Sequence, residues 1–126
     1  MTIFARAVAR IVVGGSLAAA GIGPAQAAGA LAVGTCGAYG FAYDYQQAEA
    51  ARTAALGKCK GSTCKIVTAM RGSCAAFAID GRNACGPLGY ASATRLGQAQ
   101  NTALRQCYRF GGKDCVIRAW VCDAKG

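Results

Sequence analysis

The chain has 126 residues, of which 54% are hydrophobic and 15% charged, with 14 Lys and Arg, 5 Asp and Glu and no His. This length allows one small domain, and the sparse charge argues against a disordered chain. Without histidine the chain lacks the commonest general base and metal ligand, and five acids are too few for most carboxylate chemistry. We therefore expect a non-enzymatic protein with no catalytic residues, no metal and no cofactor.

Residues 1–27 have the three-part layout of a secretory signal peptide. Two Arg give a positively charged start, an uncharged apolar run follows over 11–22, and Ala25-Gln26-Ala27 forms a cleavage site. The run is short of the roughly 20 residues that span a bilayer, and no later apolar stretch is long enough. We expect export with cleavage, to the periplasm or outside the cell, which leaves residues 28–126 with a net charge of +7 and no membrane span.

Strand and helix signals begin directly after this segment. Aromatic residues alternate with small ones over 39–45, which is strand periodicity, and alanines then recur at helical spacing. Asp44 is a candidate N-cap for that helix. The expected elements of the first half are a strand around Leu31 and Val33, a strand over 39–45, a helix over 48–59 and a strand over 64–71.

The second half of the chain repeats this order of elements. AALGKC at 54–59 matches TALRQC at 102–107, and the four cysteines of each half correspond at offsets of 49, 48, 51 and 48 residues. Such self-similarity indicates a duplicated supersecondary unit, and each unit is too small to bury a core alone. The expected elements are strands over 76–79 and 88–91, a helix over 96–107 with Ser92 as its cap, and a strand over 115–122. We predict an α+β fold: a single small disulfide-stapled domain over 28–126, built from two tandem β-β-α-β repeats, 29–74 and 75–122, with pseudo-two-fold symmetry, about six strands and two helices.

Eight cysteines, all after residue 27, indicate disulfides rather than zinc. An even number of cysteines in a small exported domain is typical of a disulfide framework. Zinc sites usually have C-x2-C spacing, which this sequence lacks, and no His is present to complete a mixed site.

The expected strand directions suggest which cysteines pair. The end of each helix and the start of the next strand lie close together, which favours Cys59–Cys64 and Cys107–Cys115. Cys74 and Cys122 lie at the opposite end and would join the two halves. Cys36 and Cys85 are the two cysteines that remain, so their pairing follows by elimination. Both fall in predicted hairpin turns.

The strand residues fall into a small set and a bulky set. Gly40, Ala42 and Gly89 suit close contact with the alanine-rich helices. The opposite parity supplies the candidate ligand-binding residues: Tyr39, Phe41, Tyr43, Tyr45, Tyr90, Arg71, Arg118 and Trp120. On an open face, aromatic rings stack on sugars or bases and Arg adds ionic contacts. On a covered face the same aromatics form a core, which is the commoner outcome for alternating strand aromatics.

Basic residues flank the helix-end cysteines in both halves. They are Lys58, Lys60 and Lys65 in the first half and Arg105, Arg109 and Lys113 in the second. A positive rim attracts anionic partners, here an anionic envelope polymer or an acidic protein, although positive charges near helix C-termini are also favourable on a solvated edge. Export argues against nucleic acid as a physiological partner.

The ordered set of short motifs resembles the bacterial exported family of domain of unknown function 4189. The resemblance rests on GALAVG and AYGFAYDY in the first half, the A-A-L-x-x-C helix end, C-K-I-V, RNAC at 82–85 and the closing CVIRAWVC. It covers nearly the whole region after residue 27. It implies bacterial origin and pairing of the helix-end cysteine with the next strand, and it implies no activity.

Three candidate functions remain for such a chain. We expect an exported, non-enzymatic binding or interaction module of unknown ligand. The alternatives are an inhibitor or immunity-type protein that blocks an acidic enzyme, and a small hydrolase that acts on the envelope. The lack of His and of paired acids favours the binding module.

Overall fold

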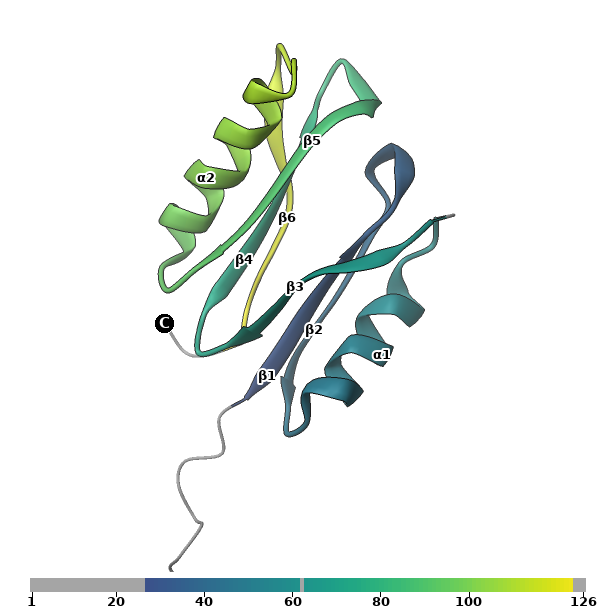
Figure 1. The fold of residues 1–126 in the computed structure, drawn as a ribbon, viewed down its shortest axis with the longest axis vertical. Helices are drawn as coiled ribbons and strands as arrows, with labels where there is room; N and C mark the ends of the chain where they lie inside the picture. The colour runs from purple at the N-terminus through teal and green to yellow at the C-terminus, as the bar shows by residue number, and fades with distance from the viewer. Residues whose placement is uncertain (1–26, 62, 124–126) are drawn as a thin grey trace, which may run out of the picture.

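Each half of the chain forms a three-stranded antiparallel sheet with one helix (Figure 1). The computed structural model describes residues 27–61 and 63–123. The first half contains β1 (Ala28–Val33), a short 3-10 turn η2 (Thr35–Gly37), β2 (Tyr39–Tyr45), α1 (Ala48–Lys58) and β3 (Lys65–Arg71). The second contains β4 (Cys74–Asp80), β5 (Asn83–Ala93), α2 (Leu96–Arg109) and β6 (Cys115–Cys122).

The strand orders are equivalent in the two sheets, β2-β1-β3 and β5-β4-β6. The first strand of each half lies in the centre and pairs antiparallel with both neighbours. Each helix therefore connects two outer strands that run in the same direction, as expected. The predicted α+β fold of six strands and two helices is confirmed.

Successive side chains of the central strands point to opposite faces of the sheet, so small residues face the helix and large residues face the other sheet. Ala30 and Ala32 of β1 are fully buried against α1, whose Ala51 and Ala55 face them. In the second half, buried alanines of β4 and α2 form the equivalent layer: Ala76, Ala78, Ala99 and Ala103. Such small side chains let each helix lie close to its sheet.

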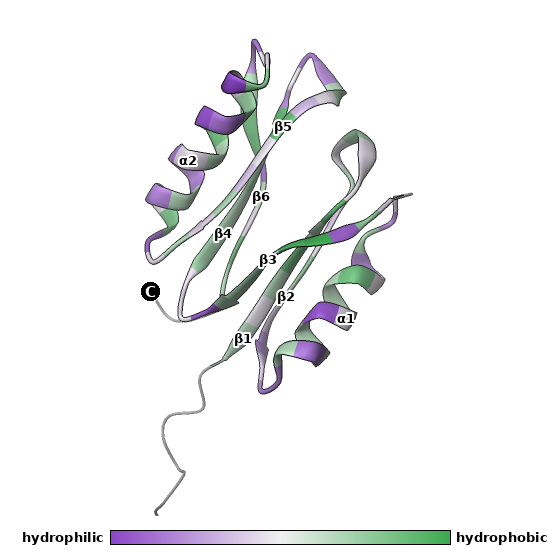
Figure 2. Ribbon diagram, viewed as in Figure 1, coloured by the Kyte–Doolittle hydropathy of each residue, from purple (hydrophilic) through white to green (hydrophobic). Residues whose placement is uncertain are grey.

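Two glycines bring the helices closer still. A Cβ added to Gly40 of β2 would collide with the carbonyl of Ala55, and one added to Gly89 of β5 would collide with the carbonyl of Ala103. Because any side chain would push the helix away, the predicted small face is confirmed at both glycines. Figure 2 shows that hydrophilic residues alternate with hydrophobic ones along both helices.

The large residues of the same strands form a core between the two sheets. Leu31 and Val33 of β1 and Phe77 and Ile79 of β4 belong to one buried cluster, with contributions from β3 and β6. The sheets thus pack through the faces that the helices leave uncovered, and the helices lie on the outside (Figure 1). The face opposite the helices is therefore mostly an interior surface.

The two predicted helix caps are wrong. The N-cap residues are Gln47 and Arg95, and neither side chain makes a capping hydrogen bond. Asp44 instead adopts a left-handed conformation, φ 62°, inside β2, where the pairing register with β1 shifts. Asp tolerates this conformation better than most residues do, because its short side chain can bond locally.

All eight cysteines form disulfides, with the four predicted pairs. Cys59–Cys64 and Cys107–Cys115 each join a helix end to the following strand. Cys36–Cys85 joins η2 to β5 and so links the two halves. Cys85 was expected in a hairpin turn, but the turn is at Gly81 and Arg82, and β5 begins before the cysteine.

The expected role of Cys74–Cys122 as a link between the halves is wrong. Cys74 begins β4 and is the direct cross-strand partner of Cys122 in β6, so the bond lies within the second sheet. The connection between the sheets is held by Asp123, which is buried. Its carboxylate accepts the backbone N–H groups of Gly72 at 3.1 Å and Ser73 at 2.6 Å.

The predicted signal peptide, 1–27, lies outside the described residues except for its last position. Within the described ranges, neither helix has the length and apolar character needed to cross a bilayer.

Candidate functional site

Three of the predicted aromatic residues form a row along β2. The rings of Tyr39 and Phe41 are stacked with centroids 6.1 Å apart, and those of Phe41 and Tyr43 with centroids 6.3 Å apart. Tyr39 and Phe41 are half-buried because they pack against the core between the sheets. Tyr43, which extends beyond that core, is 50% exposed. The row is thus part core and part surface.

Arg118 of β6 covers the inner end of this row. Its guanidinium lies 5.3 Å from the centroid of the Tyr39 ring, and its Nε–H donates to the carbonyl of Gly37 at 3.2 Å. The pairing of β6 with β4 skips Arg118, which marks a bulge there. The bulge turns this side chain toward the other half of the molecule.

Strand irregularities separate the remaining predicted residues from the row. Tyr45 follows the left-handed Asp44 and packs in the cluster beneath α1. Arg71 pairs with Ala28, whose side chain also faces α1. The prediction that these two residues share a face with Tyr39 is therefore wrong.

Trp120 also lies apart from the row. It is the cross-strand partner of Ala76, which faces α2, so the bulge at Arg118 puts Trp120 and Arg118 on opposite faces of the sheet. The indole is 52% exposed. The predicted common parity of these two residues is wrong, because simple alternation fails at a bulge.

A cleft of about 810 Å³ opens elsewhere, between the two halves. Tyr90 of β5 lies in its wall and also packs against the core between the sheets. Apolar surface comes from Val33, Pro87, Leu88 and Phe110, and the Cys36–Cys85 disulfide lines one side. A cleft of this size and mixed lining is typical of small-molecule sites.

Two cations from different halves line this cleft. Lys65 begins β3, and Arg109 ends α2. Both belong to the predicted basic rim, and both are exposed. Among the described residues that line the cleft there is no Asp or Glu. The lining therefore favours a negatively charged group.

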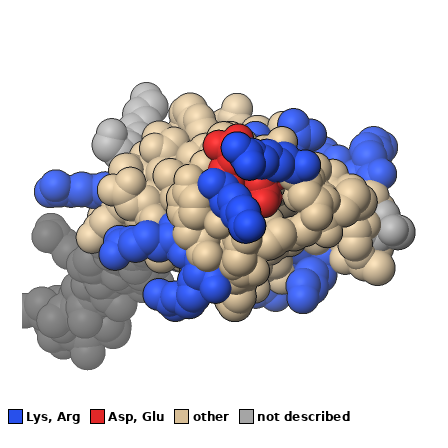
Figure 3. All heavy atoms as spheres, turned by 90° about the horizontal axis from the view of Figure 1, so that it is seen from above, with Lys and Arg blue, Asp and Glu red and all other residues tan. Residues whose placement is uncertain are grey.

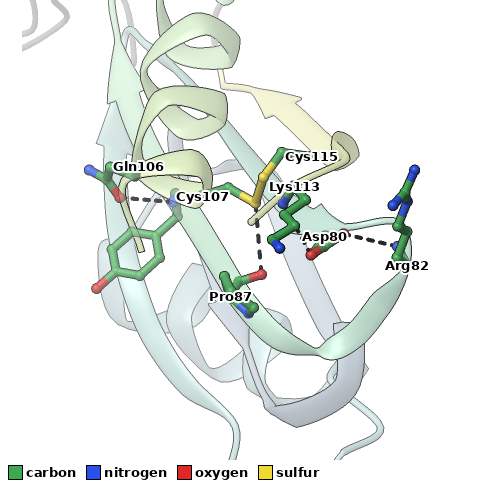
Figure 4. Close-up of a disulfide and its surroundings, with 8 residues drawn as sticks. Asp80, Arg82, Pro87, Gln106, Cys107, Lys113 and Cys115 are labelled. Atoms are coloured by element: carbon green, nitrogen blue, oxygen red, sulfur yellow. Dashed lines mark hydrogen bonds between the residues drawn. A yellow bond between two sulfur atoms is a disulfide. The ribbon is translucent and has the colours of Figure 1, made fainter. Parts of the chain in front are cut away.

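Gln106 of α2 completes the polar side of the cleft. Its side-chain oxygen accepts the backbone N–H of Tyr90 at 3.1 Å (Figure 4). This bond fixes the amide so that its NH2 group remains as a donor. The donor adds to those of Lys65 and Arg109 in the same lining.

The surrounding end of the molecule is mostly positive. Figure 3, which looks onto this end, shows Lys and Arg side chains at several separate places and acidic side chains gathered near the centre. Lys58 ends α1, and Arg105 lies one helical turn before Arg109, but neither lines the cleft. Lys60 lines a second hollow of about 490 Å³, which shares only Thr35 and Cys36 with the cleft.

Asp80 is committed to the turn between β4 and β5. Its carboxylate accepts the backbone N–H of Arg82 at 2.9 Å and that of Lys113 at 3.3 Å (Figure 4). The Arg82 N–H bond is the main cause that lowers the pKa of Asp80 below its ordinary value, and burial opposes the shift. The group is held as an ionised acceptor, which suits a structural role better than proton transfer.

Sequence patterns missed several residues of the cleft. Gln106 lies on a helix with no unusual pattern around it, and its role depends on a contact with a residue 16 positions earlier. Phe110 could have been found, because an aromatic residue follows the predicted basic rim directly at the helix end. It is 66% exposed.

Comparison with known families assigns nearly all of the described chain to one family. Residues 28–122 match the family described as domain of unknown function (DUF4189). The chain belongs to this family. No curated protein and no solved structure matches it.

Proposed function

We propose that this protein is an exported binding module that holds an anionic ligand in the cleft between its two halves and performs no catalysis. The cleft itself carries this proposal. Lys65 and Arg109, one from each half, line it together with Gln106, and the described lining contains no carboxylate. An anionic envelope polymer or an acidic protein could present such a group.

Export is supported by the cysteines and by the first residues. Four disulfides in a domain this small are typical of an oxidising compartment. The layout of residues 1–27 fits a cleaved signal peptide. The intact mass of the protein recovered after export should equal that of a chain that begins at Ala28. A mass that includes the first 27 residues would contradict export with cleavage.

The absence of catalysis is supported by the state of the acids. Asp80 and Asp123 are buried and accept backbone N–H groups. Glu49 forms an ion pair on the surface of α1, where its Oε1 lies 3.3 Å from a guanidinium nitrogen of Arg52. The other two acids, Asp44 and Asp114, are exposed, and the sequence has no histidine, the commonest general base.

Thermal unfolding with added anions tests the proposal. Phosphate, citrate and poly-glutamate should raise the melting temperature at low salt, because a ligand bound only to the folded state stabilises it. The double variant Lys65→Met/Arg109→Met should lose the response. Lys58→Met/Arg105→Met removes the same charge outside the cleft and should keep it.

The control variant gives the decisive comparison. If both double variants lose the response equally, anions bind the general positive surface and the proposed site is wrong. If no anion raises the melting temperature of the unmodified protein, the proposed binding function itself is contradicted.

A further inference from the structure

The cleft has a large apolar surface beside its cationic groups. Leu88 and Tyr90 project from β5, and Val33 ends β1. Phe110 also lines the cleft and is 66% exposed. A ligand that carried only charge would leave this surface in contact with water.

The polar groups of the cleft are arranged as donors. The Gln106 oxygen already accepts the Tyr90 N–H, which leaves the amide NH2 as a donor in a lining that also contains Lys65 and Arg109. Carbonyl groups at the C-terminal end of α2 also find hydrogen-bond donors within the chain. The carbonyls of Gln106, Cys107 and Tyr108 accept the N–H groups of the three residues at 110–112.

The Cys36–Cys85 disulfide forms a wall between the cleft and the second hollow. Cys36 lines both cavities and is covalently fixed to β5 of the other half. The two hollows adjoin at Thr35 and Cys36. A wall fixed to both halves also keeps the cleft preformed, which lowers the cost of binding.

We infer that the ligand of this cleft is a small amphipathic anion, with one carboxylate or similar acidic head and an apolar body. The inference rests on the proposed anion-binding function and adds the apolar body and the small size. The head lies between Lys65 and Arg109, and the body lies against Leu88, Tyr90 and Phe110. The volume of about 810 Å³ is within the range of sites for small molecules.

Calorimetric titration of the disulfide-bonded exported protein with three probes tests this inference. Decanoate has both head and body, acetate has the head alone, and 1-decanol has the body alone. Decanoate, kept below its micelle concentration, should bind one to one, and each partial probe should bind at least about tenfold more weakly. A free fatty acid and a lipid fragment share this chemistry, so lysophosphatidic acid, titrated in parallel, distinguishes a phosphate head from a carboxylate.

Matched variants locate the binding. Arg109→Met should weaken decanoate about fivefold or more and leave 1-decanol unchanged, whereas Arg105→Met should change neither. Phe110→Ala should weaken decanoate but not acetate. Leu56→Ala, which removes an exposed apolar residue from α1, is its control.

The possible outcomes distinguish a failure of this inference from a failure of the proposed anion-binding function. If acetate and poly-glutamate bind as tightly as decanoate, the apolar body is not recognised and the inference is wrong, while anion binding stands. If 1-decanol binds as tightly as decanoate, charge is not recognised and both proposals are wrong. Absence of binding by every probe also overturns both.

Discussion

The two halves of the chain share their frame and differ at the end where the cleft lies. Both have the same strand order, buried alanines under the helix and a glycine where the helix touches the sheet. At the cleft, however, α2 is 14 residues long and α1 is 11. The extra length of α2 carries Arg109 and is followed by Phe110, and α1 has no counterpart of either.

The turns at this end differ as well. The first half turns through η2, where Cys36 has a left-handed φ of 57°. The second half turns tightly after Asp80 and continues into an irregular stretch that leads to Pro87. We conclude that the shared residues form the frame and that the divergent residues form the candidate site.

The largest effect should come from the core between the sheets, where Leu31 and Phe77 occupy equivalent central positions. Both are fully buried. Phe77→Ala should lower the free energy of unfolding by about 3–5 kcal/mol and Leu31→Ala by about 2–5 kcal/mol, because each leaves a cavity. Urea unfolding measures both.

Two exposed aromatics are the controls for that experiment. Tyr43→Ala and Trp120→Ala should each change the free energy of unfolding by less than about 1 kcal/mol, because half of each side chain is already in water. Losses as large as that of Phe77→Ala would show that these aromatics belong to the core.

Disulfide removal should separate local bonds from long-range bonds. By chain entropy, Cys74→Ala/Cys122→Ala opens a loop of 48 residues and should cost about 4 kcal/mol. Cys59→Ala/Cys64→Ala opens a loop of 5 residues, and its counterpart Cys107→Ala/Cys115→Ala a loop of 8. Each of these should cost about 2 kcal/mol. Unequal losses for the last two would break the equivalence of the halves.

The paired glycines give a sharper comparison of the two helix contacts. Gly40→Ala and Gly89→Ala should each cost about 1–3 kcal/mol, because the new methyl group collides with the helix backbone. Gly57→Ala in α1 and Gly97→Ala in α2 meet no atom within 4 Å. These control changes should stabilise by about 0.5–1 kcal/mol through helix propensity. A loss in only one half would show that the helices pack differently.

Asp80, in the turn between β4 and β5, should make the stability of the protein sensitive to acid. Its folded-state pKa is lowered, chiefly by the N–H of Arg82, so the ionised form is the more stabilising one. This stabilisation is present above the unfolded-state pKa and is lost as pH falls through the lower folded-state value. The free energy of unfolding should therefore fall less between pH 5 and about pH 2 in Asp80→Asn than in the unmodified protein. Equal pH profiles would contradict this role.

Much of the fold could be predicted from local patterns. Leu31 and Val33 among alanines, the alanine stripe of the helices and the cysteine offsets were sufficient for the strands, helices and disulfide pairs. These features depend on residues close in sequence or on a repeated spacing. The separation into two stacked sheets could not be predicted, because it depends on which faces meet in space.

The candidate site was harder to predict for a specific reason. Alternation assigns a face to each strand residue only while the strand remains regular. The irregularities at Asp44 and Arg118 moved Tyr45 and Trp120 away from the aromatic row. The cleft combines Lys65 with Arg109, residues of different halves, and only the packing of the halves brings them to one lining.

Nuclear magnetic resonance with decanoate tests the central claim most directly, because it reports the position of binding residue by residue. Our account predicts concentration-dependent shifts of the backbone amides of Lys65, Tyr90, Gln106 and Arg109, with no shift at Tyr43 or Trp120. Shifts confined to Tyr43 and Trp120, or spread evenly over the basic residues, would contradict a binding cleft between the two halves.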